Sequence, residues 1–515
     1  MTGDQVVLLS TLLAPLAGAV LAASLPPEED RVGRILGTVA AGAAFVASVA
    51  LLLGRGRAAP AGPDPDPAGV VGRMWSEIDV AWVPGLDLRF HIGVDGLSYP
   101  LVVLTTLLTF LCALYTCVHV PPTGGPARGR HLVALLLVIE VGIVGVFLAL
   151  DLVLFFVLFE VVLLPMYAVI AVWGGEDRRA AARKFVLYTL FGSVLLLVGV
   201  FTVVVAAGTA DMVALASGAG QSMSRGTQLA AFILLALAFA VKSPLWPLHT
   251  WLPDAHTQAP TVGSVILAGV LLKMGTYGLI RVAVGAAPEG AEALAPVLGV
   301  LAVAAIIVGG LVCLAQTELK RLIAYSSVGH MGFVLLGIAT LTTAGFQAAI
   351  IGNIAHGVIT GLLFFLAGAV KDRAHTGSLD ELGGLREVSP GLAGVLGYAA
   401  IASLGLPGLA GFWGEAFAVF AAFQRGGPLW IVLGVIAAIG AALAAAYFLR
   451  MLRQVTHGAP APAVAGLSPR WVTGAEFVSW APLVLLALVL GLVPALVTAP
   501  AAGPVADLIA GLEAR

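Results

Sequence analysis

Charged side chains are scarce in this sequence. Of its 515 residues only 10% are charged and 60% are hydrophobic, whereas an ordinary soluble domain is about 25% charged. The mean hydropathy is +1.04. The formal net charge is only -2, and no block of Lys and Arg of the kind that follows phosphates is present. These features exclude a nucleic-acid partner and indicate a protein embedded in lipid.

Cysteine is also rare. Cys112, Cys117 and Cys313 all lie inside apolar runs and show no C-x-x-C spacing, which excludes a zinc knuckle and a disulfide framework. We expect all three to pack in the core. The first residues, MTGDQVVLLS, lack the positive segment of a cleaved signal peptide, so we expect this run to persist as a helix.

Long apolar runs dominate the rest of the chain. A helix needs about 20 apolar residues to cross the hydrocarbon, and fourteen stretches satisfy this, beginning near residues 5, 31, 96, 130, 152, 184, 227, 260, 294, 321, 343, 390, 427 and 475. With both termini on the outer side, most of the 26 Lys and Arg residues fall in inner loops, as the positive-inside rule requires. The sequence predicts an all-α polytopic membrane protein.

We expect one membrane domain over residues 1–515. Its parts are helices one to three (1–129, with an outer segment at about 54–95), two repeats (130–284 and 294–455), and a loop with the last helix (456–515). The outer segment begins with the Pro- and Asp-rich AAPAGPDPDPAG, which cannot form a helix. Alternating residues around Pro84 and Gly85 then predict a short hairpin.

Two of the runs are interrupted. Pro244 and Pro247 break the seventh run just after Lys242, and GLPGLAG breaks the twelfth run just before Glu415. In lipid, such breaks occur only where backbone faces protein or water, and paired breaks are typical of transporters. Each break falls in the fourth run of a five-helix unit. The pattern predicts two inverted repeats, helices four to eight and nine to thirteen.

Ionisable residues lie near the middle of several runs. Glu160 in the fifth run is expensive in lipid unless it is paired or hydrated, and Lys242 is the partner we expect. Separating the pair would favour release of the lysine proton. The alternative is a fixed salt bridge that only braces the broken helix.

Four more groups extend this series at similar depth. They are Lys273, His330, His356 and Glu415, from runs eight, ten, eleven and twelve. Because histidine titrates near neutrality, the series suits a lateral proton relay, although each histidine alone would be read as a packing residue. For Glu140 in run four, a relay role and a packing role are equally expected.

Other polar residues have simpler interpretations. Asp151 lies at a helix boundary, and we expect it to be solvated or to cap a helix. The spacing of His249, Asp254 and His256 matches no standard metal site, so we expect no metal and instead contact with water at a channel mouth. Haem ligation by His330 and His356 lacks any supporting motif.

Several stretches resemble one known family. VKSPLWPLHTWLPDAHTQAPTVGSVILAGVLLKMG is similar to the signature of the antiporter-like proton-channel subunits of complex I, which Mrp-type cation/proton antiporters share. GVDGLSYPL, FEVVLLPMY, LKRLIAYSSVGHMGF and AHGVITGLLFF match in the same order. The resemblance extends over nearly the whole chain.

Within that family, GLPGLAGFWGEAF resembles the M chain, because L and N chains have lysine where Glu415 stands, and the chain stops after a short tail instead of a long lateral helix. The resemblance implies that Glu160 and Lys242 form the charge pair of the first half-channel. Lys273, His330 and His356 would form the central connection, Glu415 the terminal site toward the outer face, and Glu140 a modulatory acid.

The resemblance also implies partners. Flavin, iron–sulfur clusters and quinone would belong to other subunits of NADH:quinone oxidoreductase, with no cofactor in this chain, and L-type and N-type subunits would be neighbours in the membrane. Composition favours a bacterial plasma membrane. Two rival functions are a subunit of a cation/proton antiporter and a purely architectural membrane subunit. A neutral substitution at Glu160 separates the architectural role from a relay.

Overall fold

The computed structural model describes residues 1–55, 74–83, 85, 88–122, 128–467 and 472–513. Within them, 14 helices are long and apolar enough to cross a membrane, which confirms an all-α polytopic membrane protein. The helices are α1 Gly3–Ser24, η1 Pro27–Glu29, α2 Asp30–Ala50, α3 Leu52–Arg55, α4 Tyr99–Thr116, α5 Gly129–Leu148, α6 Leu152–Val161, α7 Leu163–Trp173, α8 Arg178–Ala207, α9 Met212–Ala216, η4 Ala219–Ser222, α10 Arg225–Lys242, α11 Trp251–Gln258, α12 Thr261–Ile266, η5 Leu267–Leu271, α13 Leu272–Gly278, η6 Leu279–Val284, α14 Pro288–Leu314, α15 Leu319–Ala339, α16 Thr343–Ala374, η7 Leu379–Glu381, α17 Leu385–Val388, α18 Pro390–Ser403, α19 Ala410–Arg425, α20 Gly427–Thr456, α21 Pro462–Ala465, α22 Gly474–Leu492 and α23 Ala495–Glu513.

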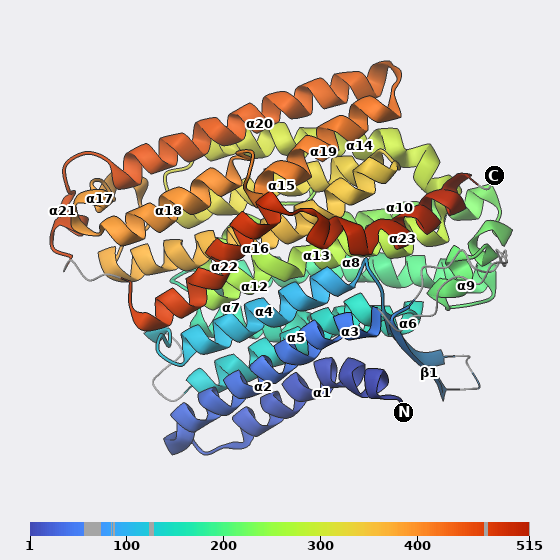
Figure 1. Ribbon diagram of the computed structural model, residues 1–515, viewed down its shortest axis with the longest axis horizontal. Coiled ribbons are helices and arrows are strands. Elements are labelled where there is room, and N and C mark those ends of the chain that lie inside the picture. The colour runs from blue at the N-terminus through green and yellow to red at the C-terminus, as the bar shows by residue number, and fades with distance from the viewer. Residues whose placement is uncertain (56–73, 84, 86–87, 123–127, 468–471, 514–515) are drawn as a thin grey trace.

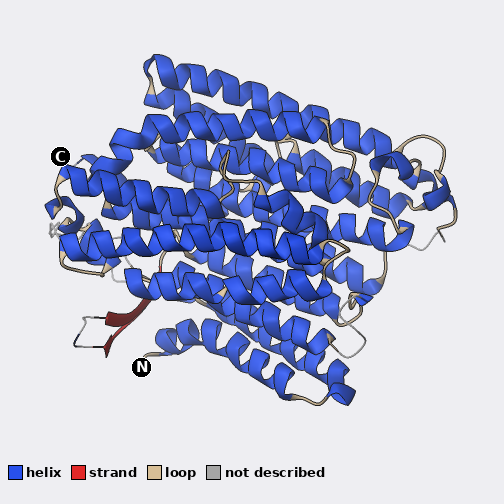
Figure 2. Ribbon diagram, turned by 180° about the vertical axis from the view of Figure 1, so that it is seen from behind, coloured by secondary structure: helices blue, strands red, loops and turns tan. Residues whose placement is uncertain are grey.

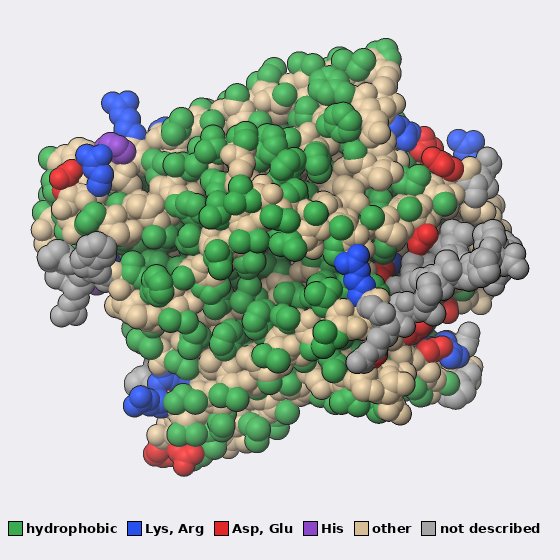
Figure 3. Space-filling model, viewed as in Figure 1, with side chains coloured by type: hydrophobic (Ala, Val, Ile, Leu, Met, Phe, Trp, Pro, Cys, Tyr) green, Lys and Arg blue, Asp and Glu red, His purple; other side chains and the backbone are tan. Residues whose placement is uncertain are grey.

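The long helices run roughly along one direction, and both termini lie at the same end of the bundle (Figure 1). The connecting segments that include the short helices α17 and α21 lie at the opposite end (Figure 1). A broad hydrophobic band covers the visible surface between two charged ends (Figure 3). Such a band matches the surface that lipid tails require. We call the end with the termini the terminal end.

Strands β1 (Ser76–Val83) and β2 (Leu88–Val94) form one antiparallel hairpin at the terminal end, with Asp79 opposite His91. The predicted hairpin is therefore confirmed, and it stands out as the only strand pair drawn in Figure 2. The Pro- and Asp-rich stretch that precedes it lies outside the described residues.

The seventh run is broken where its prolines predicted. α10 ends at Lys242, and helix resumes at Trp251 in α11. The indole Nε1 of Trp251 donates to the carbonyl of Val241 at 3.0 Å, and the Ser243 hydroxyl donates to Phe239 O at 2.6 Å. Side chains thus satisfy carbonyls near the end of α10, as a break within a membrane requires.

The twelfth run is broken too, because α18 ends at Ser403 and α19 begins at Ala410. Gly405 and Gly408 adopt φ of +78° and +94°, values that side chains rarely tolerate. A Cβ atom on Gly405 would also lie 2.8 Å from Glu415 Oε2. Both predicted breaks are confirmed, whereas the inverted relation of the two repeats stays a prediction.

The C-terminal segment differs from the sequence prediction. A short tail was expected after the last span, but residues Ala495–Glu513 form the further helix α23, which follows α22 toward the terminal end (Figure 1). Pro500 and Pro504 obscured this helix in the sequence because proline usually interrupts helices. α23 packs so closely that a Cβ on Gly96 would lie 1.7 Å from Pro500 O.

Candidate proton-relay site

Lys273 occupies the centre of the bundle. It lies on α13 between the two π-helical segments η5 and η6, and it is fully buried. Such π segments are frequent at functional sites. The ammonium Nζ donates to Ala268 O at 2.5 Å and lies 2.6 Å from His356 Nδ1. Lys273 and His356 are therefore within hydrogen-bond distance of each other.

His330 on α15 continues this series. Its ring centroid lies 5.9 Å from that of His356 on α16. Its Nδ1 lies 2.9 Å from Glu415 Oε1 on α19. The predicted residues Lys273, His356, His330 and Glu415 are thus brought together, from four helices that are distant in sequence. A small pocket is lined by His330, His356 and Glu415, among others.

One contributor to this cluster, and one polar pair beside it, were not found in the sequence. The hydroxyl of Ser403 lies 3.1 Å from His330 Nε2, so the second ring nitrogen of His330 also has a partner. Asn353 Oδ1 accepts from the Thr276 hydroxyl at 3.0 Å. Two sequence positions could have pointed to these residues. Ser403 stands directly before the second break, and Asn353 stands three residues before His356 on the same helix.

Lys242 and Glu160 do not form the direct pair that we expected. The Lys242 ammonium lies 4.9 Å from the ring centroid of Phe159, a cation–π arrangement. Glu160 Oε1 has no hydrogen-bond partner among the described residues. The aromatic ring next to Glu160 in sequence takes the position that the carboxylate was expected to fill.

Glu160 also lies at an irregularity. α6 ends at Val161 and α7 begins at Leu163, because Pro165 has no N–H for the carbonyl four residues earlier. Glu140 on α5 is fully buried, and neither carboxylate oxygen has a partner among the described residues. Glu140 is not joined to the central cluster by any hydrogen bond in the described part of the chain.

Asp254 and His256 on α11 have different surroundings. Asp254 lies 2.7 Å from Lys184 Nζ and 3.2 Å from Arg321 Nη1, so it joins α11 to α8 and α15. His256 is fully buried against Phe364, with ring centroids 4.4 Å apart. The expectation that His256 contacts water at a channel mouth is therefore wrong, since α11 turns this ring toward α16.

Asp151 caps α6, as expected. Its Oδ1 accepts from the amides of Val153 and Leu154 at 2.9 and 2.8 Å. Burial raises the pKa of the Asp151 carboxyl above its ordinary value, and these two amide hydrogen bonds act in the opposite direction. Cys112 and Cys313 are buried in the core, and Cys117 is partly buried.

Comparison with known proteins identifies the family. Residues 149–440 match the family model described as NADH:quinone oxidoreductase/Mrp antiporter, TM. The chain is 39% identical to NADH-quinone oxidoreductase subunit M of Rhodobacter capsulatus, over 97% of this chain and 96% of that one. The chain belongs to this family.

Other relatives agree. Subunit M of Rickettsia conorii is 39% identical over 80% of this chain and 82% of its own length. A chain of respiratory complex I from Thermus thermophilus superposes with a TM-score of 0.84 at 30% identity, covering 98% of this chain and 99% of that one. A chain of the Mrp complex from Dietzia sp. gives a TM-score of 0.83 at 22% identity, covering 99% and 98%, and shares the fold.

Proposed function

We propose that this chain is the M-type antiporter-like subunit of NADH:quinone oxidoreductase and moves protons across the membrane without redox chemistry of its own. The observation that carries the proposal is the series inside the bundle in which Lys273 contacts His356, His356 faces His330, and His330 contacts Glu415. Each of these groups can bind and release a proton.

The geometry supports lateral transfer in this series. Lys273 can give a proton to His356 Nδ1 across 2.6 Å, and His330 can give one to Glu415 across 2.9 Å. The cavity beside both histidines has space for the water that would link them. Lys242 and Glu160 would supply Lys273 from the other broken helix, with Glu140 modulating that half.

We place the terminal end on the outer, periplasmic side of a bacterial plasma membrane, because most Lys and Arg residues then face the cytoplasm. Flavin, iron–sulfur clusters and quinone would be held by partner subunits. L-type and N-type subunits would flank this one in the membrane. Redox chemistry in those partners would drive transfer against about 2.3 kcal/mol per charge for each 100 mV.

The test is NADH-driven proton uptake by sealed membrane vesicles that carry Glu160→Gln or Glu415→Gln, with assembly of the complex measured in parallel. Glu387→Gln is the matched control, since its side chain is 56% exposed. We expect both intramembrane variants to assemble and to lose proton uptake while the control keeps it. Normal uptake per NADH in either intramembrane variant would contradict the relay.

The same vesicles test the rival functions. An antiporter subunit would exchange protons for Na⁺ when a Na⁺ gradient is imposed without NADH, whereas the proposed subunit would not. An architectural subunit would tolerate both neutral substitutions as long as the complex assembles.

A further inference from the structure

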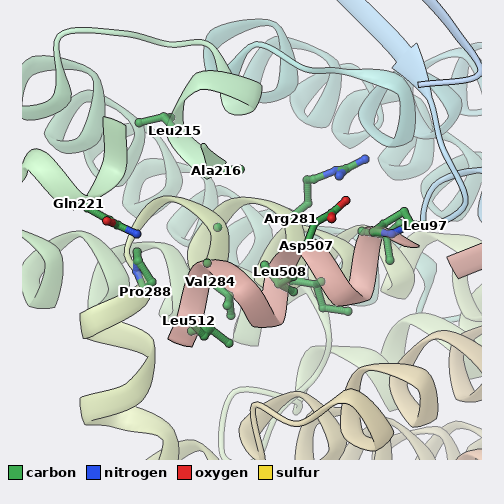
Figure 4. A pocket seen from close by; sticks show the side chains of 14 residues that line it. Leu97, Leu215, Ala216, Gln221, Arg281, Val284, Pro288, Asp507, Leu508 and Leu512 are labelled. Atoms are coloured by element: carbon green, nitrogen blue, oxygen red, sulfur yellow. The ribbon is translucent and has the colours of Figure 1, made fainter. Parts of the chain in front are cut away.

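A pocket opens at the terminal end of the bundle, the end that the proposed function places on the outer side. Figure 4 shows the side chains that line it. Helix α23 forms one wall with Asp507, and the end of η6 forms another with Arg281. Ala216 and Gln221 at the rim are exposed. Water from the outer side can therefore reach the Arg281 side chain, whose relative exposure is 18%.

Arg281 is held in place by two acceptors. Its Nη2 binds the fully buried carboxylate of Asp95, and its Nε donates to the Tyr277 hydroxyl at 3.2 Å. The Tyr277 hydroxyl in turn donates to Phe147 O at 3.0 Å. The rings of Tyr277 and Phe147 meet edge to face at 5.2 Å between centroids. These contacts form a layer of side chains next to the pocket.

The layer lies close to the relay. Lys273, Tyr277 and Arg281 follow one another at four-residue steps, so they lie on one side of the same span. At the α-helical rise of 1.5 Å per residue, the eight residues from Lys273 to Arg281 span at most about 12 Å along the axis, because the π-helical turn of η6 rises less. Only two helical turns thus separate outer water from the central lysine. A proton that crossed them would bypass His356, His330 and Glu415.

Arginine is suited to prevent that crossing. A guanidinium has five N–H donors and no acceptor, and it does not lose its proton in proteins. It therefore cannot pass a proton along a hydrogen-bonded chain. Tyr277 cannot pass one either in this arrangement, because its oxygen accepts from Arg281 and its proton is directed to a backbone carbonyl. A fixed cation also repels an approaching hydronium, as in other proton-excluding pores.

We propose that Arg281 is a proton stop, which closes the outer end of this span and so directs protons from Lys273 sideways to Glu415. The proposal rests on the proposed function, since it needs Lys273 to carry protons. Asp95 is the positioning residue that holds the guanidinium. Asp507 is the other charged group facing the pocket from α23.

The test uses purified complete complex in liposomes without NADH. A K⁺ diffusion potential drives protons inward, and a dye inside reports the pH. Arg281→His replaces the guanidinium with a ring that accepts a proton on one nitrogen and releases it from the other. We expect passive proton entry to rise several-fold. In the double variant with Lys273→Met, entry should return to the level of the unchanged complex.

Asp507→Asn is the matched control, since it alters a charge in the same pocket and leaves Arg281 and Asp95 intact, and we expect no leak. If Arg281→His fails to assemble, Arg281→Ala with Asp95→Asn removes both charges and leaves space for water from the pocket, which can carry protons, with the same expected leak. An assembled variant without a leak would overturn the proposal. So would a leak that persists with Lys273→Met, because it would not pass through the relay.

The two proposals fail in different ways. Lys273→Met that pumps normally with NADH contradicts the relay itself. Loss of pumping in Lys273→Met together with a tight Arg281→His complex contradicts only the stop.

Discussion

Substituting Gly414 tests whether the close packing of α19 against α16 sets the position of Glu415. A Cβ atom on Gly414 would lie 2.6 Å from the backbone Cα of Gly352, and backbone cannot rotate away as a side chain can. Restoring an ordinary contact of about 3.4 Å would require the two helices to move about 0.8 Å apart. Glu415 follows Gly414 directly on α19 and would move with it.

The expected effect has two parts. Overpacking of a tight interior site costs about 1 to 3 kcal/mol, which should lower the thermal stability of the complex without preventing assembly. The distance between His330 Nδ1 and Glu415 Oε1 is now 2.9 Å. It would exceed hydrogen-bonding distance if the whole helix displacement were directed along this contact. Displacements of this size can reduce the rate of a step by up to about 100-fold, so we expect NADH-driven proton uptake to fall at least tenfold in Gly414→Ala.

Gly397→Ala is the matched control. Gly397 lies on α18, the other half of the same broken span, and nothing lies within 4 Å of the position that its Cβ would take. Both variants are compared by proton uptake in sealed vesicles and by the amount of assembled complex. If Gly414→Ala pumps as well as Gly397→Ala, the contact between the two glycines does not position Glu415.

Two predictions concern residues away from the relay. Burial acts to lower the pKa of His91, but its 2.6 Å bond to Glu77 and neighbouring acidic residues raise it overall above the ordinary 6.5. Protonated His91 therefore stabilises the hairpin fully below pH 6.5, and this stabilisation is lost as the pH rises through the raised pKa. We expect amide hydrogen exchange in the hairpin, corrected for its intrinsic pH dependence, to accelerate at alkaline pH. His91→Gln should abolish this acceleration. Glu476 accepts two bonds of 2.8 Å from Arg373, and its side chain is 1% exposed. Removing one member of such a pair costs about 3 kcal/mol or more, so Glu476→Gln should lower the melting temperature of the complex. Arg373→Met combined with Glu476→Leu should recover most of that decrease. If the double variant melts as low as Glu476→Gln, the charges themselves are needed.

Much of the fold could be predicted from local sequence. The length of a span is fixed by the bilayer, and proline acts on its own turn, so the apolar runs and the break after Lys242 were visible without tertiary information. The hairpin near Pro84 was visible for the same reason, because alternation and turn residues are local signals. Helix α23 was missed because two prolines within it suggested a break that neighbouring helices compensate.

The candidate relay residues were also visible, since a charge inside an apolar run is expensive whatever surrounds it. Their contacts were decided only by tertiary structure. Sequence could not show that Lys242 faces Phe159 instead of Glu160, that Ser403 holds His330, or that α11 buries His256. Composition and spacing determine which polar and charged groups need a partner inside lipid. The packing of helices that are distant in sequence determines which residue is that partner.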